Sequence, residues 1–173
     1  AKWIDFWTGP TMLDAVSEPT ASAGSEPTRS SAQTRRVAAI DIGTNSTHLL
    51  VAGVDTILGT FSIEQAEKST TRLGERDPDS GELTSAGMDR AFETLRRFRD
   101  LAVSHDVEQI VTAATSAVRE APNGREFLQS IQDGLDIDVD LVSGPEEARL
   151  IYLGVLSGMT FGDRPHLLLD IGG

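Results

Sequence analysis

The pattern of apolar and polar residues becomes regular from about residue 37 onward. Three short apolar runs follow one another there: VAAIDIG from Val37, THLLVAGV from Thr47 and ILGTFSIE from Ile57. Only a few residues separate these runs, and connections this short join antiparallel strands, whereas parallel strands need a long crossover. The pattern therefore predicts three strands linked by hairpins.

The remaining sequence alternates between helical and strand patterns. Between residues 84 and 104 the apolar positions lie near one stripe of a helix, which carries Met88, Phe92, Leu95 and Ala102. After it we expect a strand over 107–112, a helix from Asn123, a strand over 137–142, a helix over 143–159 and a strand over 167–171. Glu126 follows Asn123 at the spacing of a capping box. This order predicts an α/β fold with a mixed sheet covered by helices.

The first 36 residues have a different composition from the rest. Residues 17–36 read SEPTASAGSEPTRSSAQTRR, with no aromatic residue and with alanine as the single apolar type. Such a segment cannot bury enough apolar surface to offset the entropy lost on ordering. We therefore expect residues 1–36 to form a disordered, low-complexity tail and residues 37–173 to form one domain.

Composition and charge exclude several classes of function. The 173 residues include no cysteine, which rules out disulfide scaffolds, zinc–thiolate sites and thiol nucleophiles. Lys and Arg number 15 against 27 Asp and Glu, and the formal net charge of −12 argues against binding of a nucleic-acid polymer. We find neither an apolar run of roughly 18 residues, as a membrane span needs, nor a secretory leader. We expect a cytoplasmic protein without a membrane partner.

Residues 41–46, DIGTNS, are the first candidate for chemistry, and we call them the first glycine loop. Gly43 lets the backbone approach a ligand closely. The amides from Gly43 to Ser46 and the side chains of Thr44, Asn45 and Ser46 can donate to phosphate oxygens. Asp41 faces the same mouth and can hold a hydrated Mg²⁺. The alternative is an ordinary polar hairpin turn.

Residues 170–173, DIGG, repeat this design after the apolar run HLLL, and we call them the second glycine loop. In the expected fold both strand ends line one cleft, so that the two loops hold a phosphate chain from two sides. Asp170 then shares the metal with Asp41, and Gly172 and Gly173 bind phosphate. The alternative is a buried strand that leads into a flexible end.

Two further segments carry charged candidates. In TSAVREAPN the guanidinium of Arg119 can bind phosphate through two hydrogen bonds, although it could instead pair with Glu120 at the surface. In SGPEEARL, Ser143 as N-cap makes Glu146 structural and leaves Glu147 free as a base. A cap one residue later would exchange the two glutamates, because proline favours the first helical position. The three histidines have no metal-ligand spacing and are expected to be structural, and Arg72 is expected to be an exposed loop residue.

These motifs together resemble the exopolyphosphatase/guanosine pentaphosphate phosphohydrolase family. DIGTNSTHLLVAGV, TSAVREAPN, SGPEEARLIYLGV and LLDIGG occur in the family's order with similar spacing. The resemblance implies a ribonuclease-H-like, actin-like domain and a second such domain across a cleft. It implies Mg²⁺-dependent release of terminal phosphate from polyphosphate, or of the 5′ γ-phosphate from guanosine pentaphosphate, and we expect the full-length parent to be a homodimer.

The resemblance also assigns roles to residues. The family's catalytic glutamate falls on Glu147 and its phosphate-binding arginine on Arg119. The chain departs from the family at Arg76 and Asp77, where an LGEGL-like stretch is expected, and it ends within the second glycine loop. We therefore expect this chain alone to hydrolyse weakly at best. The rival interpretations are an actin-like kinase or ATPase, and a non-catalytic sensor of polyphosphate or alarmone.

Overall fold

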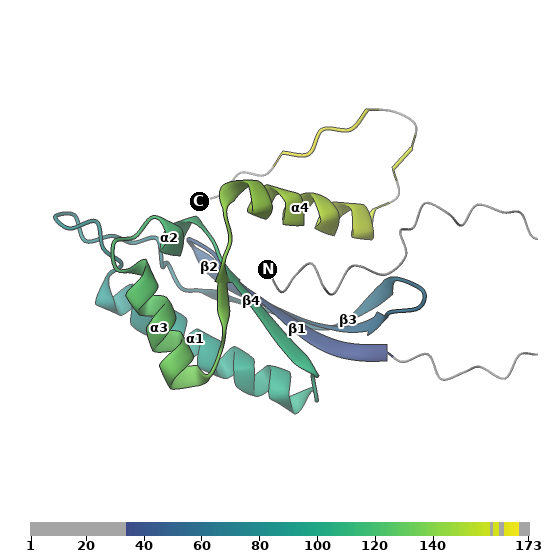
Figure 1. Ribbon diagram of the computed structural model, residues 1–173, viewed down its shortest axis with the longest axis horizontal. Coiled ribbons are helices and arrows are strands. Elements are labelled where there is room, and N and C mark those ends of the chain that lie inside the picture. The colour runs from purple at the N-terminus through teal and green to yellow at the C-terminus, as the bar shows by residue number, and fades with distance from the viewer. Residues whose placement is uncertain (1–33, 160, 163–164, 170–173) are drawn as a thin grey trace, which may run out of the picture. The chain divides into compact units, whose positions relative to one another are not determined.

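A computed structural model of the chain describes residues 34–159, 161–162 and 165–169 (Figure 1). In chain order its elements are β1 (Thr34–Ile42), β2 (Ser46–Asp55), β3 (Thr60–Thr70), α1 (Ser85–Ser104), β4 (Gln109–Ala114), α2 (Ser116–Arg119), α3 (Gly124–Leu135), β5 (Val139–Leu141) and α4 (Gly144–Gly158).

The five strands form one mixed sheet in the order β3-β2-β1-β4-β5. The β1–β2 and β2–β3 pairs are antiparallel, whereas the β1–β4 and β4–β5 pairs are parallel. The predicted hairpins and the predicted mixed sheet are therefore confirmed. This arrangement brings the carboxyl ends of β1 and β4 side by side, with Ile42 paired with Ala114.

The core lies on one face of the sheet, beneath α1 and α3 (Figure 1). Alternate residues of β1 and β2 point toward these helices, because successive side chains of a strand face opposite ways. The fully buried side chains of this layer include Ile42, Leu49, Val51, Leu95, Phe98 and Ile131. The predicted helix over 84–104 is confirmed, and its N-cap Thr84 accepts a hydrogen bond from the Gly87 amide at 3.1 Å.

The boundary predicted for the N-terminal tail is three residues too late. Thr34 to Arg36 belong to β1, where Thr34 pairs with Asp55 and Arg36 with Gly53. Their polar composition does not indicate a strand. They form one because β2 is long enough to pair with them. Residues 1–33 lie outside the described residues, so the rest of the predicted tail stays a prediction.

The capping box predicted at Asn123 is wrong. Asn123 does precede α3, but its side chain makes no cap hydrogen bond with the described residues of that helix. Its Oδ1 accepts from the Leu83 amide at 2.9 Å, and its Nδ2 donates to the Leu83 carbonyl at 3.1 Å. A side-chain amide that bonds both the N–H and the C=O of one residue in this way satisfies all of these groups, so the long-range contact outcompetes the local cap.

The strand predicted over 167–171 is not present in its described part. Residues 165–169 are irregular, and Leu167 is 92% exposed. A strand needs a partner for its backbone hydrogen bonds, and no other described segment pairs with these residues. By contrast, part of the expected loop after β4 folds into the short helix α2.

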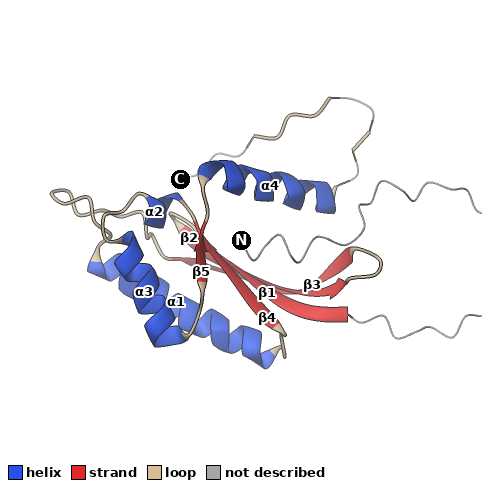
Figure 2. Cartoon of the chain, in the orientation of Figure 1, coloured by secondary structure: helices blue, strands red, loops and turns tan. Residues whose placement is uncertain are grey.

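Helix α4 runs along the side of the sheet opposite α1 and α3 (Figure 2). None of its described residues is buried, and Tyr152, Leu153 and Leu156 are exposed. Among the described helices, none is both long and apolar enough to cross a membrane.

Candidate active site

The candidate site forms where β1, β4 and α4 meet at one edge of the sheet. Because β1 and β4 are parallel neighbours, the segments that follow them lie next to each other. The Thr115 amide donates to the Ile42 carbonyl at 3.3 Å, and the Thr44 and Ser116 hydroxyls share a hydrogen bond of 3.1 Å. These contacts join the first glycine loop to the start of α2, which carries Arg119.

The first glycine loop turns tightly between β1 and β2. The Gly43 amide donates to the Ser46 carbonyl at 3.1 Å, and a Cβ at Gly43 would lie 2.9 Å from that oxygen. A side chain at this position would therefore displace the backbone. The turn occupies the Gly43 amide, so the prediction that this amide also faces a ligand is wrong.

The next two amides of the loop are available to a ligand. The Thr44 carbonyl accepts from Gly74 at 2.7 Å, and the Asn45 carbonyl accepts from Thr71 and Arg72 at 3.1 and 2.9 Å. The amides of Thr44 and Asn45, by contrast, donate to none of the described residues. With its carbonyls engaged and two amides free, the loop offers donors to an anion. Ser46 is buried at the start of β2, on the strand face that also carries His48.

Asp41, the first residue of the loop, lies at the end of β1 on the sheet face opposite the core. It pairs in register with His48, and part of its side chain reaches solvent. Desolvation raises the pKa of the Asp41 carboxyl above its ordinary value, and the negative charge of Glu147 raises it further, while His48 opposes both. The effect of Glu147 on this pKa means that the two carboxyl groups are close enough for their charges to interact.

Arg119 and Glu147 form the charged centre of the site. Their Nη1 and Oε2 atoms are 3.5 Å apart, and the Arg119 Nη1 also donates to the Val142 carbonyl at 2.7 Å. The side chains are 29% and 31% exposed, so a ligand can reach both while the protein holds them. A looser contact of 3.7 Å joins Arg119 to the exposed Glu120, so the surface pairing that we considered coexists with the one in the site.

The helical register separates the two adjacent glutamates. Ser143 is the N-cap of α4, and its Oγ accepts from the Glu146 amide at 3.3 Å. The register with a cap at Gly144 is therefore wrong. The Glu146 carboxylate is bound by Arg149 at 3.0 Å and makes no described bond to the Ser143 amide, so only half of the expected capping box forms. Glu147 is the glutamate that faces Arg119.

The remaining predicted site residues lie outside the described residues. They are Asp170, Gly172 and Gly173 of the second glycine loop. Among the described residues, no cluster of three or more His, Asp or Glu side chains could hold a metal ion. The donors present still suit Mg²⁺, which binds through one or two carboxylates together with substrate phosphates. Burial raises the pKa of the Asp41 carboxyl, and a cation bound there would favour its ionised form.

Sequence reasoning missed three contributors to the site. His48 faces Asp41, which the hairpin register could have shown, because a turn with Thr44 and Asn45 at its tip places these two residues opposite each other. Ser116 binds Thr44. Residues 71–76, which we call the bridging segment, contact the first glycine loop through Gly74, and the Arg76 guanidinium donates to the Ala117 carbonyl of α2. The departure from the family noted at Arg76 therefore lies at a structural contact of the site.

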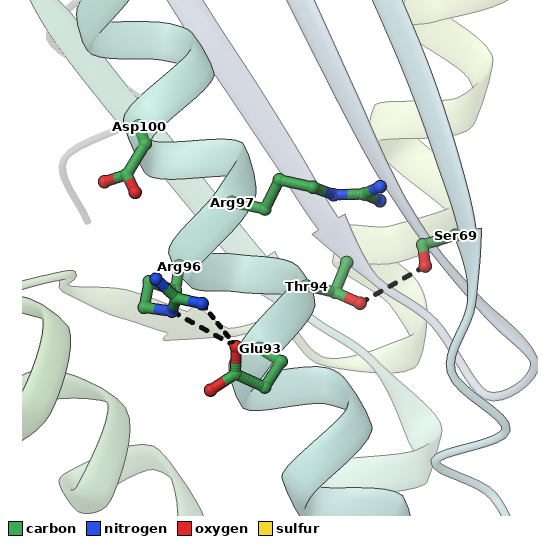
Figure 3. Close-up of a pocket in the computed structure, with 6 residues that line it drawn as sticks. All are labelled: Ser69, Glu93, Thr94, Arg96, Arg97 and Asp100. Carbon is green, nitrogen blue, oxygen red and sulfur yellow. Dashed lines mark hydrogen bonds and ion pairs between the residues drawn. The ribbon is translucent and has the colours of Figure 1, made fainter.

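The larger of two described hollows lies away from this chemistry. It measures about 430 Å³ between the β3 edge and α1 (Figure 3). Within it Arg96 pairs with Glu93 at 2.7 Å, and Thr94 donates to the Ser69 hydroxyl at 3.2 Å. Its charges are of both signs and its carboxylates do not converge on a common point, so the contacts around Arg119 and Glu147 are the better candidate.

The strand order, the helix positions and the glycine loop define a ribonuclease-H-like, actin-like domain. Solved structures share this fold at substantial identity. The Ppx/GppA member from Aquifex aeolicus has a TM-score of 0.66 and 30% identity, over 71% of this chain and 40% of that one. An exopolyphosphatase from Cytophaga hutchinsonii has a TM-score of 0.64 and 35% identity, over 69% and 38% of the two chains.

Sequence comparison identifies the family. The Ppx/GppA phosphatase family matches residues 50–173, so the chain belongs to that family. Exopolyphosphatase 1 of Mycobacterium tuberculosis is 33% identical over 139 residues, which cover 80% of this chain and 40% of the relative. The chain thus spans about 40% of the length of the curated relatives it matches. The matched range includes Arg119 and Glu147 and begins after the first glycine loop.

Replacing Asp41 by asparagine is expected to stabilise the fold at neutral pH. The raised pKa means that the folded state holds the Asp41 proton more tightly than the unfolded state does, so stability falls as pH rises above 3.8. Asparagine does not titrate, and the stability gained from Asp41→Asn should therefore shrink as pH falls from neutral toward 3.8. Urea unfolding at neutral and acidic pH measures this difference. A gain that does not change with pH would contradict it.

Proposed function

We propose that the full-length protein, meaning a chain of its relatives' length that contains these residues, releases terminal phosphate from inorganic polyphosphate. The observation that carries the proposal is the contact between Glu147 and Arg119, beside a glycine loop with two free amides. Membership of the Ppx/GppA family and relatives named exopolyphosphatase support it. The 5′ γ-phosphate of guanosine pentaphosphate is the second proposed substrate, and a cytoplasmic homodimer is the proposed form of the enzyme.

Each of the described site residues has a separate role in the proposed hydrolysis. The amides of Thr44 and Asn45 bind oxygens of the phosphate chain, and Arg119 neutralises charge on the phosphoryl group that is transferred. A water molecule attacks the terminal phosphorus while the anhydride bond to the next phosphate breaks. Glu147 orients this water and accepts its proton, and the shortened chain leaves with the electron pair of the broken bond.

Mg²⁺ is the proposed cofactor, with Asp41 and Asp170 as its protein ligands. When bound, it supplies positive charge that offsets the phosphate oxygens. Asp41 holds its carboxylate at the end of β1 and can bind the ion directly or through water. Such a cation would also ease the binding of a polyanion to a chain whose formal net charge is −12.

Phosphate release by the full-length protein tests the proposed function. We expect release from polyphosphate and from guanosine pentaphosphate, dependent on Mg²⁺ and independent of ATP. A requirement for ATP as donor or substrate would favour the kinase or ATPase alternative. Tight binding of either polyanion without turnover would favour the sensor alternative. Either a requirement for ATP or binding without turnover would refute the proposed hydrolysis of these polyanions.

A further inference from the structure

A second arginine adjoins the first glycine loop on the side away from Arg119. Arg119 follows β4, on one side of the β1–β2 hairpin, and Arg72 follows β3, on the other side. The amides of Thr71 and Arg72 both donate to the Asn45 carbonyl, at 3.1 and 2.9 Å. The Arg72 backbone is therefore anchored to the loop whose amides are free. From this anchor an arginine side chain is long enough to reach a ligand bound at the loop.

The bridging segment is pressed against the loop in an unfavourable backbone conformation. Arg72 has a φ of 49°, in the left-handed region that residues with a Cβ rarely adopt. Two residues later, a Cβ at Gly74 would lie 2.3 Å from the Thr44 Cγ2, which only a glycine avoids. Such strain persists where surrounding contacts enforce it, and here those contacts are with the loop.

Arg72 also lines a hollow of about 300 Å³ together with Thr70, Glu75 and Arg90. Arg90 is fixed by an ion pair of 2.7 Å with Glu75 and by a hydrogen bond of 2.9 Å to the Thr71 carbonyl. The Arg72 guanidinium makes no hydrogen bond or ion pair with any described residue. The hollow therefore presents one uncompensated positive charge. It opens beside the loop, because Thr70 pairs in register with Ser46.

We propose that Arg72 and this hollow bind a phosphate of the substrate other than the one that is removed. The inference rests on the proposed function and adds a subsite to it. The ligand is an oligophosphate anion, because a guanidinium binds a phosphate through two parallel hydrogen bonds and a hydroxyl such as that of Thr70 can add a third. Inorganic polyphosphate and the 3′-diphosphate of guanosine pentaphosphate both offer this chemistry.

Removal of the Arg72 charge in the full-length protein tests the subsite. Arg72→Gly suits the left-handed backbone and keeps the fold, and Arg72→Gln is the second variant. For long-chain polyphosphate we expect KM to rise about fivefold, as for the loss of one partly exposed charge-assisted contact, with kcat within about twofold. For tripolyphosphate, which fills the loop and Arg119 first, we expect both constants to stay within about twofold of the wild type.

Arg97→Gln is the matched control, because it removes the same charge from a residue of the other hollow (Figure 3), about 10 Å along α1 from Arg90. It should leave KM unchanged for every substrate. Equal losses on short and long chains, a fall in kcat alone, or no change in either Arg72 variant would overturn the subsite. A KM increase confined to guanosine pentaphosphate supports it and assigns the hollow to the 3′-diphosphate.

Failure of the proposed function can be distinguished from failure of the subsite. A wild-type protein that hydrolyses none of the substrates would refute the function. In that case calorimetric titration with long-chain polyphosphate still compares wild type and Arg72→Gly. A Kd raised about fivefold supports the subsite, and an unchanged Kd refutes it.

Discussion

Replacing Glu147 by glutamine in the full-length protein is expected to lower the rate of phosphate release by about 10²–10⁴-fold. Glutamine keeps the shape of the side chain and can still contact Arg119, which lies 3.5 Å away. It cannot accept a proton from water at neutral pH. Substrate binding and the unfolding midpoint should therefore change little. Steady-state release of phosphate from polyphosphate, together with thermal unfolding, measures both quantities.

Glu146→Gln provides the control, because it makes the same chemical change one residue earlier. The Glu146 carboxylate binds Arg149 on the surface of α4, and the cap at Ser143 uses the backbone amide of Glu146, which the substitution leaves in place. We expect activity within about twofold of the wild type and a stability change below about 0.5 kcal/mol. Loss of turnover in Glu146→Gln and its retention in Glu147→Gln would exchange the two roles.

The features that the sequence could predict are those that local physics determines. Short gaps between apolar runs predicted the two hairpins, and the helical stripe over residues 84–104 predicted α1. The turn at the first glycine loop could be predicted because an apolar strand that runs into Asp-x-Gly is typical of a tight turn, whereas its role in binding stays a prediction. The N-cap at Ser143 was one of two possible registers, and the structure selects it through the Glu146 amide.

The features that escaped prediction depend on contacts between segments far apart in the sequence. Asn123 had a local capping option, yet its amide group pairs with Leu83, 40 residues away. The bridging segment shows no periodicity. Its role is visible only in two hydrogen bonds, from the Gly74 amide to the Thr44 carbonyl and from the Arg76 guanidinium to the Ala117 carbonyl. Composition placed Thr34 in a tail because pairing with Asp55 is invisible in a one-dimensional pattern.

The bridging segment connects the first glycine loop to α2, a link that the motifs alone do not predict. It holds the first glycine loop through the Thr44 and Asn45 carbonyls and holds α2 through Ala117. A shared hydroxyl contact between Thr44 and Ser116 closes the connection. The free amides and Arg119 are therefore positioned by one connected set of contacts, and packing changes near α2 should affect phosphate binding.

Gly124→Ala is expected to show this dependence through a large loss of stability. Gly124 is the first residue of α3, and a Cβ there would lie 2.0 Å from the Val118 carbonyl oxygen and 3.0 Å from its carbon. Because the obstacle is backbone, the methyl group must push α2 and α3 apart. We expect a loss of about 3 kcal/mol in unfolding free energy, and a raised KM for polyphosphate because Arg119 adjoins Val118.

The matched control is Gly144→Ala, the same substitution at the first residue of another helix, α4. Apart from its chain neighbours, a Cβ at Gly144 meets no described atom within 4 Å, so this variant should lose less than about 1 kcal/mol, the cost of a Cβ next to Pro145. Urea unfolding and the KM for polyphosphate, measured for both variants of the full-length protein, make the comparison. If Gly124→Ala matches Gly144→Ala in both quantities, α2 is not held by α3, and the position of Arg119 must have another cause.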